Sequence, residues 1–150
     1  MLNTMSRFIF AITLCFCATF VFSQGSLAPV APDAVLKGFI KNYGNEKATW
    51  KESEGTYEAT FKLIGMPAIA WFDSTGHRMK VKVEITTEQV PAIAKSYIDR
   101  NYPKAKITKA WKWTDDKPVN TFQAEIKLGA ETKNFMFTSR GDFIKEIGKE

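Results

Sequence analysis

The stretch from Tyr57 to Leu63 (YEATFKL) returns 65 residues later as Phe122 to Leu128 (FQAEIKL), and this repeat decides the fold. In each copy apolar side chains alternate with polar ones, which is typical of an antiparallel strand with one packed side and one solvent-facing side. Two copies at constant spacing predict duplicated supersecondary units that share a core and continue one sheet. The repeat extends downstream, where Phe72, Ser74 and Gly76 return as Phe137, Ser139 and Gly141.

A second repeated segment lies upstream, at an offset of 59 residues instead of 65. Here Lys41, Asn42 and Tyr43 return as Arg100, Asn101 and Tyr102. The larger downstream offset requires a six-residue insertion between Thr108 and Phe122. Residues 114–120 (TDDKPVN) have the composition of a lengthened hairpin tip and are the predicted place of the insertion.

Each copy opens with apolar residues at helical spacing and continues with segments of period two. Asp33 is the predicted cap of the first helix; Thr86 or Thr87 is the predicted cap of the second, with Pro91 in its first turn. We therefore expect an α+β protein made of two tandem helix-plus-four-strand antiparallel repeats, which span residues 33–86 and 87–150. The two helical stripes are Val35, Leu36, Phe39, Ile40 and Tyr43, and Val90, Ile93, Ala94, Tyr97 and Ile98.

Residues 1–23 have the parts of a secretory signal peptide: Arg7, an apolar run of about 15 residues and Ser23 at the end. The run is shorter than the roughly 20 residues that span a bilayer, so we expect cleavage and no stable membrane anchor. Residues 24–32 (QGSLAPVAP) are predicted to be a flexible lead-in. Both cysteines, Cys15 and Cys17, lie within the signal, so the mature chain has no disulfide.

The mature chain carries 20 basic and 16 acidic residues, a net charge of +4, which favours acidic partners only weakly. Little else supports nucleic-acid binding. Residues 72–76 (FDSTG) and 137–141 (FTSRG) are predicted to be tight turns in which glycine has a positive φ. A phosphate or metal loop at Asp73 is the alternative interpretation, and the second copy has Thr138 there.

Taken in order, these motifs resemble the PepSY-like family, also described as β-lactamase-inhibitor-like, of small exported Gram-negative proteins. The resemblance lies in a helix that ends in Tyr43-Gly44 or Tyr102-Pro103, a tryptophan strand, an aromatic-x-Ala strand and a Phe-x-x-x-Gly hairpin, all present twice. It implies two units whose sheets join into one curved eight-stranded sheet with the helices on one face, as the periodicity also predicts. A similar inhibitor uses its open sheet face and hairpins to hold a β-lactamase, so the resemblance implies the same surfaces for binding in this protein. No inhibitory motif carries over to this sequence residue by residue.

If the odd-numbered side chains of residues 57–63 and 79–85 face the helices, their even-numbered neighbours lie on the other side of the sheet, the open face. Basic residues around an aromatic and methionine centre are typical of a protein or peptide interface. The alternative is that a loop covers the apolar residues and the lysines form a solvated surface. The candidate binding residues are Lys62, Ile69, Trp71, Arg78, Lys80, Lys82, Trp111, Trp113, Lys127 and Met136.

Trp111 and Trp113 share one side of their strand, where they could stack on sugars, bases or peptide aromatics. Because Trp50 has a comparable place in the first copy, we expect at least one of them to pack against the helices. Asp115 and Asp116, at the inserted hairpin, could be presented to a partner, although a solvated turn is the simpler interpretation.

The pattern of polar residues favours a binding protein over an enzyme. The single histidine, His77, follows a tight turn without a nucleophile motif, and no His/Asp/Glu spacing indicates a metal site. We therefore expect no catalytic residue, no cofactor and no metal. The prediction is a periplasmic or secreted protein whose open face holds a protein or peptide of the cell envelope, with inhibition of an envelope hydrolase as one outcome. A periplasmic small-ligand carrier or sensor is the alternative, and the oligomeric state is not specified.

Overall fold

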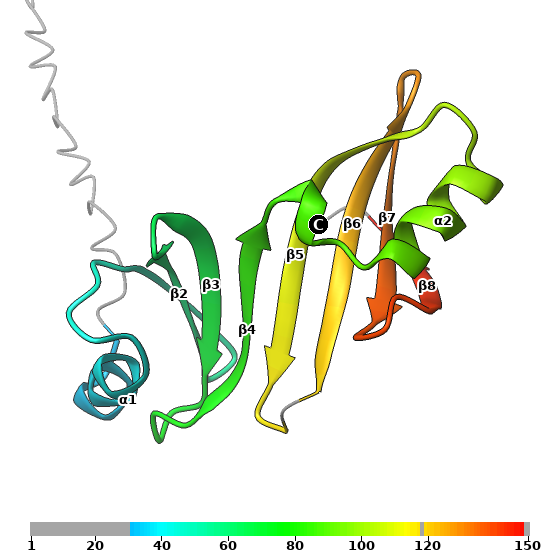
Figure 1. Cartoon of the computed structure of the whole chain (residues 1–150). Helices are drawn as coiled ribbons and strands as arrows, with labels where there is room; N and C mark the ends of the chain where they lie inside the picture. Colours follow the sequence, from blue (N-terminus) through cyan, green and yellow to red (C-terminus); the bar gives the residue numbers. More distant parts are fainter. Residues whose placement is uncertain (1–30, 118, 149–150) are drawn as a thin grey trace, which may run out of the picture.

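The computed structural model describes residues 31–117 and 119–148 (Figure 1). We refer to the helix and four strands of residues 33–85 as unit 1, and to the short turn, helix and four strands of residues 87–147 as unit 2. The predicted signal peptide and the lead-in up to residue 30 lie outside the described residues. The elements are α1 (Asp33–Tyr43), β1 (Thr49–Ser53), β2 (Thr56–Leu63), β3 (Met66–Phe72), β4 (Arg78–Ile85), the 3₁₀ turn η1 (Thr87–Gln89), α2 (Ala92–Asn101), β5 (Lys106–Asp115), β6 (Asn120–Leu128), β7 (Glu131–Thr138) and β8 (Phe143–Ile147).

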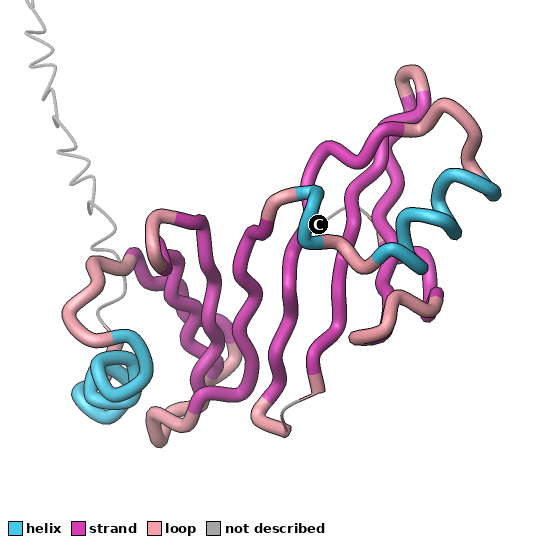
Figure 2. Tube along the Cα trace, viewed as in Figure 1, coloured by secondary structure: helices cyan, strands magenta, loops and turns pink. Residues whose placement is uncertain are grey.

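The eight strands form one antiparallel sheet whose spatial order equals the order in the sequence. Both helices lie on the same face of this sheet, α1 against the strands of unit 1 and α2 against those of unit 2 (Figures 1 and 2). The predicted α+β fold of two helix-plus-four-strand repeats is confirmed. The opposite side of the sheet is the open face.

Each unit has its own hydrophobic core, which corrects the expectation of a shared one. In unit 1, Val35 and Phe39 of α1 pack on alanine and phenylalanine side chains of β2 and β3. In unit 2, Ala94 and Ile98 of α2 pack on Ala110 of β5 and on the core residues of β6 and β7. Between the two cores, Lys112 is exposed on the helix side of the sheet. The units are therefore joined mainly by the pairing of β4 with β5.

The six-residue insertion lengthens the strands as well as the hairpin. β5 has 10 residues whereas β1 has 5. Thr114 pairs with Asn120 inside the ladder, so the turn proper is shorter than the predicted 114–120. The added length lets β5 pair with β4 as far as the Lys80–Asp115 pair. The insertion thus helps to hold the two units together.

A β-bulge in β5 decides which way its tryptophans point. Ile107 is opposite Ile126, but the next core-facing pair is Ala110 with Ala124, because the register shifts between residues 107 and 109. One extra residue reverses the alternation of sides. Trp111 and Trp113 therefore lie on the open face, and the prediction that at least one packs against the helices is wrong.

Both helix starts differ from the predicted caps. Pro32 occupies the N-cap of α1, and Asp33 is the first helical residue without a side-chain capping bond. Pro91 occupies the N-cap of α2. Thr86 instead caps the short turn η1, where its N–H donates to Oε1 of Gln89 at 3.0 Å in a capping box. Neither helix among the described residues is both long and apolar enough to cross a membrane.

The two predicted glycine turns are confirmed, with φ of +83° at Gly76 and +99° at Gly141. Gly76 also touches α1, because a β-carbon there would overlap the carbonyl oxygen of Ala34. Gly38 of α1 is equally restricted, since a β-carbon on it would overlap the carbonyl oxygen of Gly76. Two glycines thus let the first helix lie directly on the β3–β4 turn.

Candidate functional site

The strand register brings the predicted aromatic and basic residues together on the open face. Trp71 of β3 is opposite Lys80 of β4, and Lys82 is opposite Trp113 of β5. Directly opposed side chains of an antiparallel pair lie on the same side of the sheet. We refer to Trp71, Lys80, Lys82, Trp111 and Trp113 as the tryptophan–lysine cluster.

A pair of stacked indole rings forms the centre of the cluster. The ring centroids of Trp71 and Trp113 are 5.5 Å apart and the ring planes differ by 9°. Trp71 comes from unit 1 and Trp113 from unit 2, so the rings meet across β4. The stack therefore links the two units on the open face, opposite the gap between their cores.

Two lysines of β4 lie over these rings. Nζ of Lys80 is 4.6 Å from the ring centroid of Trp71 and 5.5 Å from that of Trp113. Nζ of Lys82 is 5.1 Å from the centroid of Trp113, 5.8 Å from that of Trp111 and 6.0 Å from that of Trp71. An ammonium group over an aromatic face gains about 0.5–1 kcal/mol at an exposed site and more when desolvated. Because Lys82 is only 9% exposed, these rings help to stabilise a largely desolvated cation.

Hydrogen bonds fix the orientation of both stacked rings. Nε1–H of Trp71 donates to Oε2 of Glu58 at 2.9 Å, and Nε1–H of Trp113 donates to Oε1 of Gln123 at 2.9 Å. Nε2–H of Gln123 donates in turn to Oδ1 of Asn134 at 3.2 Å. Gln123 and Asn134 are buried although they lie on the open face. Glu58, Gln123 and Asn134 were not among the residues predicted from the sequence, where the available signal was a polar residue at an open-face position beside a tryptophan.

Two apolar candidates lie on the open face at the borders of the cluster, and both are half-buried. Ile69 is opposite Lys82, and Met136 is opposite Gln123, whose other neighbour is Trp111. The predicted aromatic and methionine centre is thus assembled by the fold. Lys62 and Lys127 are exposed at strand ends, opposite Pro67 and Lys106, and lie outside the cluster.

Arg78 does not lie on the open face, which corrects its predicted place. A register shift at the end of β3 puts Arg78 opposite the core residue Phe72, and its guanidinium lies beside Tyr43 of α1. The hydroxyl of Tyr43 and Nε of Arg78 are buried side by side, without the alignment of a hydrogen bond to any described residue. Burial raises the pKa of Tyr43, and the guanidinium partly offsets this rise.

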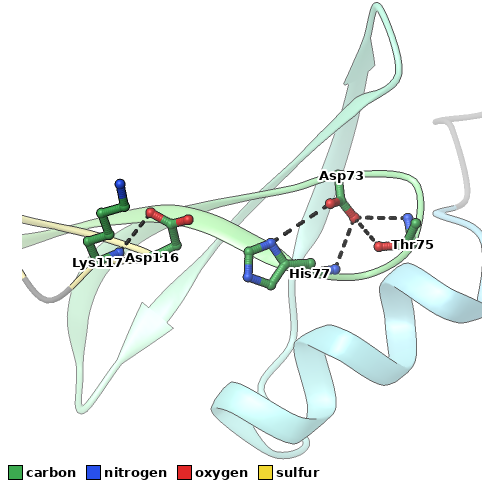
Figure 3. A network of polar contacts seen from close by, with 5 residues as sticks. All are labelled: Asp73, Thr75, His77, Asp116 and Lys117. Carbon is green, nitrogen blue, oxygen red and sulfur yellow. Dashed lines mark hydrogen bonds and ion pairs between the residues drawn. The ribbon is translucent and has the colours of Figure 1, made fainter.

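The β3–β4 turn uses the carboxylate of Asp73 to hold its own backbone (Figure 3). Oδ1 accepts hydrogen bonds from the Thr75 hydroxyl at 2.6 Å, the Thr75 N–H at 2.9 Å and the His77 N–H at 3.0 Å. The Thr75 hydroxyl is the main reason that the pKa of Asp73 is lowered. Nδ1 of His77 lies 3.8 Å from Oδ2. Across residues 31–117 and 119–148 no three His, Cys, Asp or Glu residues are grouped so that they could hold a metal ion.

Comparison with known proteins gives one family and several similar structures. The sequence model of the family described as "Putative beta-lactamase-inhibitor-like, PepSY-like" matches residues 55–145. No curated protein matches the chain.

The similar solved structures share the fold at low sequence identity. A DUF2874 family protein from Bacteroides uniformis is 20% identical with a TM-score of 0.71, over 79% of this chain and 89% of its own. A BLIP-like protein from Bacteroides fragilis is 18% identical with a TM-score of 0.67, over 82% and 88%. A structure from Bacteroides eggerthii described as "putative periplasmic proteins" is 16% identical with a TM-score of 0.72, over 79% and 89%.

Proposed function

The chain belongs to the PepSY-like, β-lactamase-inhibitor-like family, and from this premise we propose that its open face is a docking surface for a protein of the cell envelope. The observation that carries the proposal is the tryptophan–lysine cluster, in which two indole rings are stacked and hydrogen-bonded in place before any partner arrives. Rigid aromatic anchors lose little conformational entropy on binding and are enriched among residues that dominate interface energies. The protein acts in this proposal as a binder and not as a catalyst.

The open face presents charges of both signs around its apolar anchors, so the proposed occupant is a protein segment of complementary charge. Lys80 is opposite Asp115 and Lys145 is opposite Met136, while Glu58 is opposite Trp71 and Glu84 is opposite Trp111. Charged groups around apolar anchors orient a partner of complementary charge. Ile69, Trp111 and Met136 extend the apolar area beyond the stacked rings, to both sides of the lysines. The proposed contact is therefore a broad sheet-face interface, as inhibition of an envelope hydrolase would require.

The location is part of the same proposal. The signal-like residues 1–23 and the similarity in fold to a structure described as periplasmic support export to the periplasm or beyond.

An exported small-ligand carrier is the alternative, with the ligand held against the tryptophans. Native mass spectrometry of protein from its own host distinguishes the two, since a carrier retains a small mass.

Site-specific photo-crosslinking tests the proposal. A photoreactive amino acid replaces Met136 on the open face or Lys112 on the opposite side of the sheet, in protein exported by its own host. We expect the Met136 position, and not the Lys112 position, to yield one dominant protein adduct. Equal adducts from both positions would indicate random collisions and would contradict docking on the open face.

Affinity for the purified adduct partner gives the second test. Trp113→Ala removes one anchor, and we expect the Kd to rise at least tenfold, as for a central interface tryptophan. Lys112→Ala is the matched control, because Lys112 precedes Trp113 in β5 but faces the other side. Thermal melting of both variants separates lost binding from lost folding. An unchanged Kd for folded Trp113→Ala protein overturns the proposal.

A further inference from the structure

A small hollow lies between α1, the β3–β4 turn and the tip of the β5–β6 hairpin. Its volume is about 220 Å³, and it is lined by Gly38, Lys41, Asn42, Gly76, His77, Arg78 and Asp116. Pockets for drug-sized ligands measure roughly 300–1,000 Å³, so this hollow suits a smaller molecule. It lies on the helix side of the sheet, since Arg78 is opposite the core residue Phe72, and is separate from the open face.

The hollow gathers basic groups from two elements. Lys41 comes from the last turn of α1, while His77 and Arg78 come from the end of the β3–β4 turn. Nε of Arg78 is buried without an aligned hydrogen bond among the described residues, which is costly for a charged donor, although the guanidinium also interacts with the hydroxyl of Tyr43. A guanidinium presents planar donors that match the oxygens of a carboxylate or phosphate.

One carboxylate lies at the rim, on the inserted hairpin. The backbone N–H of Asp116 donates to the carbonyl oxygen of Met79 at 3.0 Å, which fixes the hairpin tip beside the end of the turn. Oδ1 of Asp116 already accepts the backbone N–H of Lys117 at 2.7 Å. Figure 3 shows the imidazole of His77 extending from the turn on the side of Asp116. Lys41, Arg78 and the imidazole of His77 thus lie near two carboxylates, Asp116 at the rim and Asp73, whose Oδ2 is 3.8 Å from Nδ1 of His77.

Unit 2 provides an internal comparison at the corresponding place. The repeat aligns Gly38 with Tyr97, His77 with Asp142 and Arg78 with Phe143. The rings of Tyr97 and Phe143 are stacked there, with centroids 4.6 Å apart and planes at 8°. The same position in the fold is therefore filled by an aromatic pair in unit 2, whereas in unit 1 it is open and basic.

We propose that this hollow of unit 1 binds a small oxyanion, with the guanidinium of Arg78 as its principal donor and Lys41 and His77 beside it. The ligand is a phosphate-type tetrahedral ion or a carboxylate, because both present oxygens to paired N–H donors. The Gly38–Gly76 contact forms one wall, and the inserted hairpin that carries Asp116 forms the opposite one.

The test is an NMR titration of the whole protein with sodium phosphate, sodium acetate and sodium chloride at constant ionic strength. We expect phosphate or acetate, and not chloride, to shift the amide signals of Gly76, His77 and Arg78 with saturation in the millimolar range. The oxyanion with the lower Kd identifies the ligand chemistry. Shifts without saturation, or equal shifts with chloride, mean general charge screening and overturn the site.

Variants give the second part of the test. Lys41→Ala is expected to raise the Kd about tenfold, the loss of one charge-assisted hydrogen bond. Arg100→Ala removes a cation from the corresponding helix position of unit 2 and should leave the Kd unchanged. Equal effects of these two exposed substitutions contradict a local site. Arg78→Met should abolish saturation. Because Arg78 is half-buried, thermal melting checks that this variant is folded. His77→Ala changes an exposed lining residue and serves as the alternative variant.

Discussion

In both units the turn glycine, Gly76 or Gly141, lies against the start of the helix, but the two units continue this contact between helix and turn in different ways. In unit 1, Gly38 brings α1 directly onto Gly76 of the turn. In unit 2, the corresponding helix position is Tyr97, whose ring stacks on Phe143. A duplicated backbone thus keeps its topology while one copy has an aromatic contact at a place that is open and basic in the other.

The first strands of the units differ as well. Trp50 of β1 packs against Phe39 of α1, with ring centroids 5.4 Å apart. In β5 the corresponding core position is Ala110, because the bulge after Ile107 has shifted the alternation by one residue. A single extra residue thus turns a core strand into one that presents Trp111 and Trp113 on the open face.

Ala110→Trp should have the largest effect, because it puts an indole at the core position that Trp50 occupies in unit 1. Ala110 is fully buried opposite Ala124. Forcing an indole into this space should destabilise the protein by about 4 kcal/mol or more. Chemical denaturation measures the loss. Deletion of Thr108 is the control, because it removes the extra residue of the bulge but leaves Ala110 opposite Ala124 and Trp111 opposite Gln123. Near-UV circular dichroism should therefore show the Trp71–Trp113 stack unchanged in the deletion variant, and its loss there would contradict the assigned register.

Gly76→Ala tests the close helix contact of unit 1. The variant combines a positive φ with overlap on Ala34, so we expect a loss of about 3 kcal/mol in the free energy of unfolding. Gly65→Ala is the matched control, because Gly65 has a φ of +81° and no atom within 4 Å of its would-be β-carbon. It should cost only about 1–2 kcal/mol. Equal losses for both variants would mean that the helix contact contributes nothing.

Phe143→Ala tests the aromatic contact of unit 2. Phe143 stacks on Tyr97 and also meets Phe135 and Phe137 edge to face, although it is 40% exposed. We expect a loss of about 2 kcal/mol, below that of a fully buried phenylalanine. Ile144→Ala, at a neighbouring position with 45% exposure, should change stability by less than about 0.5 kcal/mol. A similar result for both variants would argue against a specific stack.

A double-mutant cycle on Trp71 and Trp113 measures how strongly the open face couples the units. Stacked aromatic pairs contribute roughly 0.5–1.5 kcal/mol beyond their burial, and we expect a coupling energy of about 1 kcal/mol for Trp71→Ala with Trp113→Ala. Trp71→Ala with Phe143→Ala serves as the control pair, since these residues belong to different clusters. Coupling of the same size in the control pair would show that the cycle reports global stability instead of the stack.

The architecture could be predicted from the sequence because it follows from periodicity, which every residue of a strand or helix supports. Side-chain alternation also placed Trp71, Lys80, Lys82 and Met136 correctly on the open face. The errors fell at register shifts, where one extra residue reverses all later side chains, as at Arg78 and at Trp111. Bulges have no strong local signal, since Thr108 and Met79 are ordinary strand residues.

The separation of the cores and the supporting hydrogen bonds depend on long-range geometry. Side-chain alternation does not predict whether Lys112 lies between the two helices or beneath one of them. This depends on where each helix packs along the sheet. Glu58, Gln123 and Asn134 are likewise common open-face residues in sequence, and only the fold shows that they fix the indole rings. Contact between strands distant in sequence, and not local propensity, creates the cluster.

The smallest expected effect concerns the first of the two glycine turns and is a difference in acid sensitivity between the wild type and Asp73→Asn. Asp73 holds the turn of unit 1 and its folded-state pKa is lowered chiefly by the Thr75 hydroxyl, whereas unit 2 has Thr138 at this position. A lowered folded-state pKa means that the stabilisation is present above the unfolded value of 3.8 and is lost as the pH falls through the folded-state pKa. Below about pH 4, stability should therefore fall more steeply in the wild type than in Asp73→Asn, which keeps an acceptor but cannot titrate. Denaturation measured from pH 6 to pH 2 gives the two slopes, and identical slopes would show that the carboxylate of Asp73 does not stabilise the first turn.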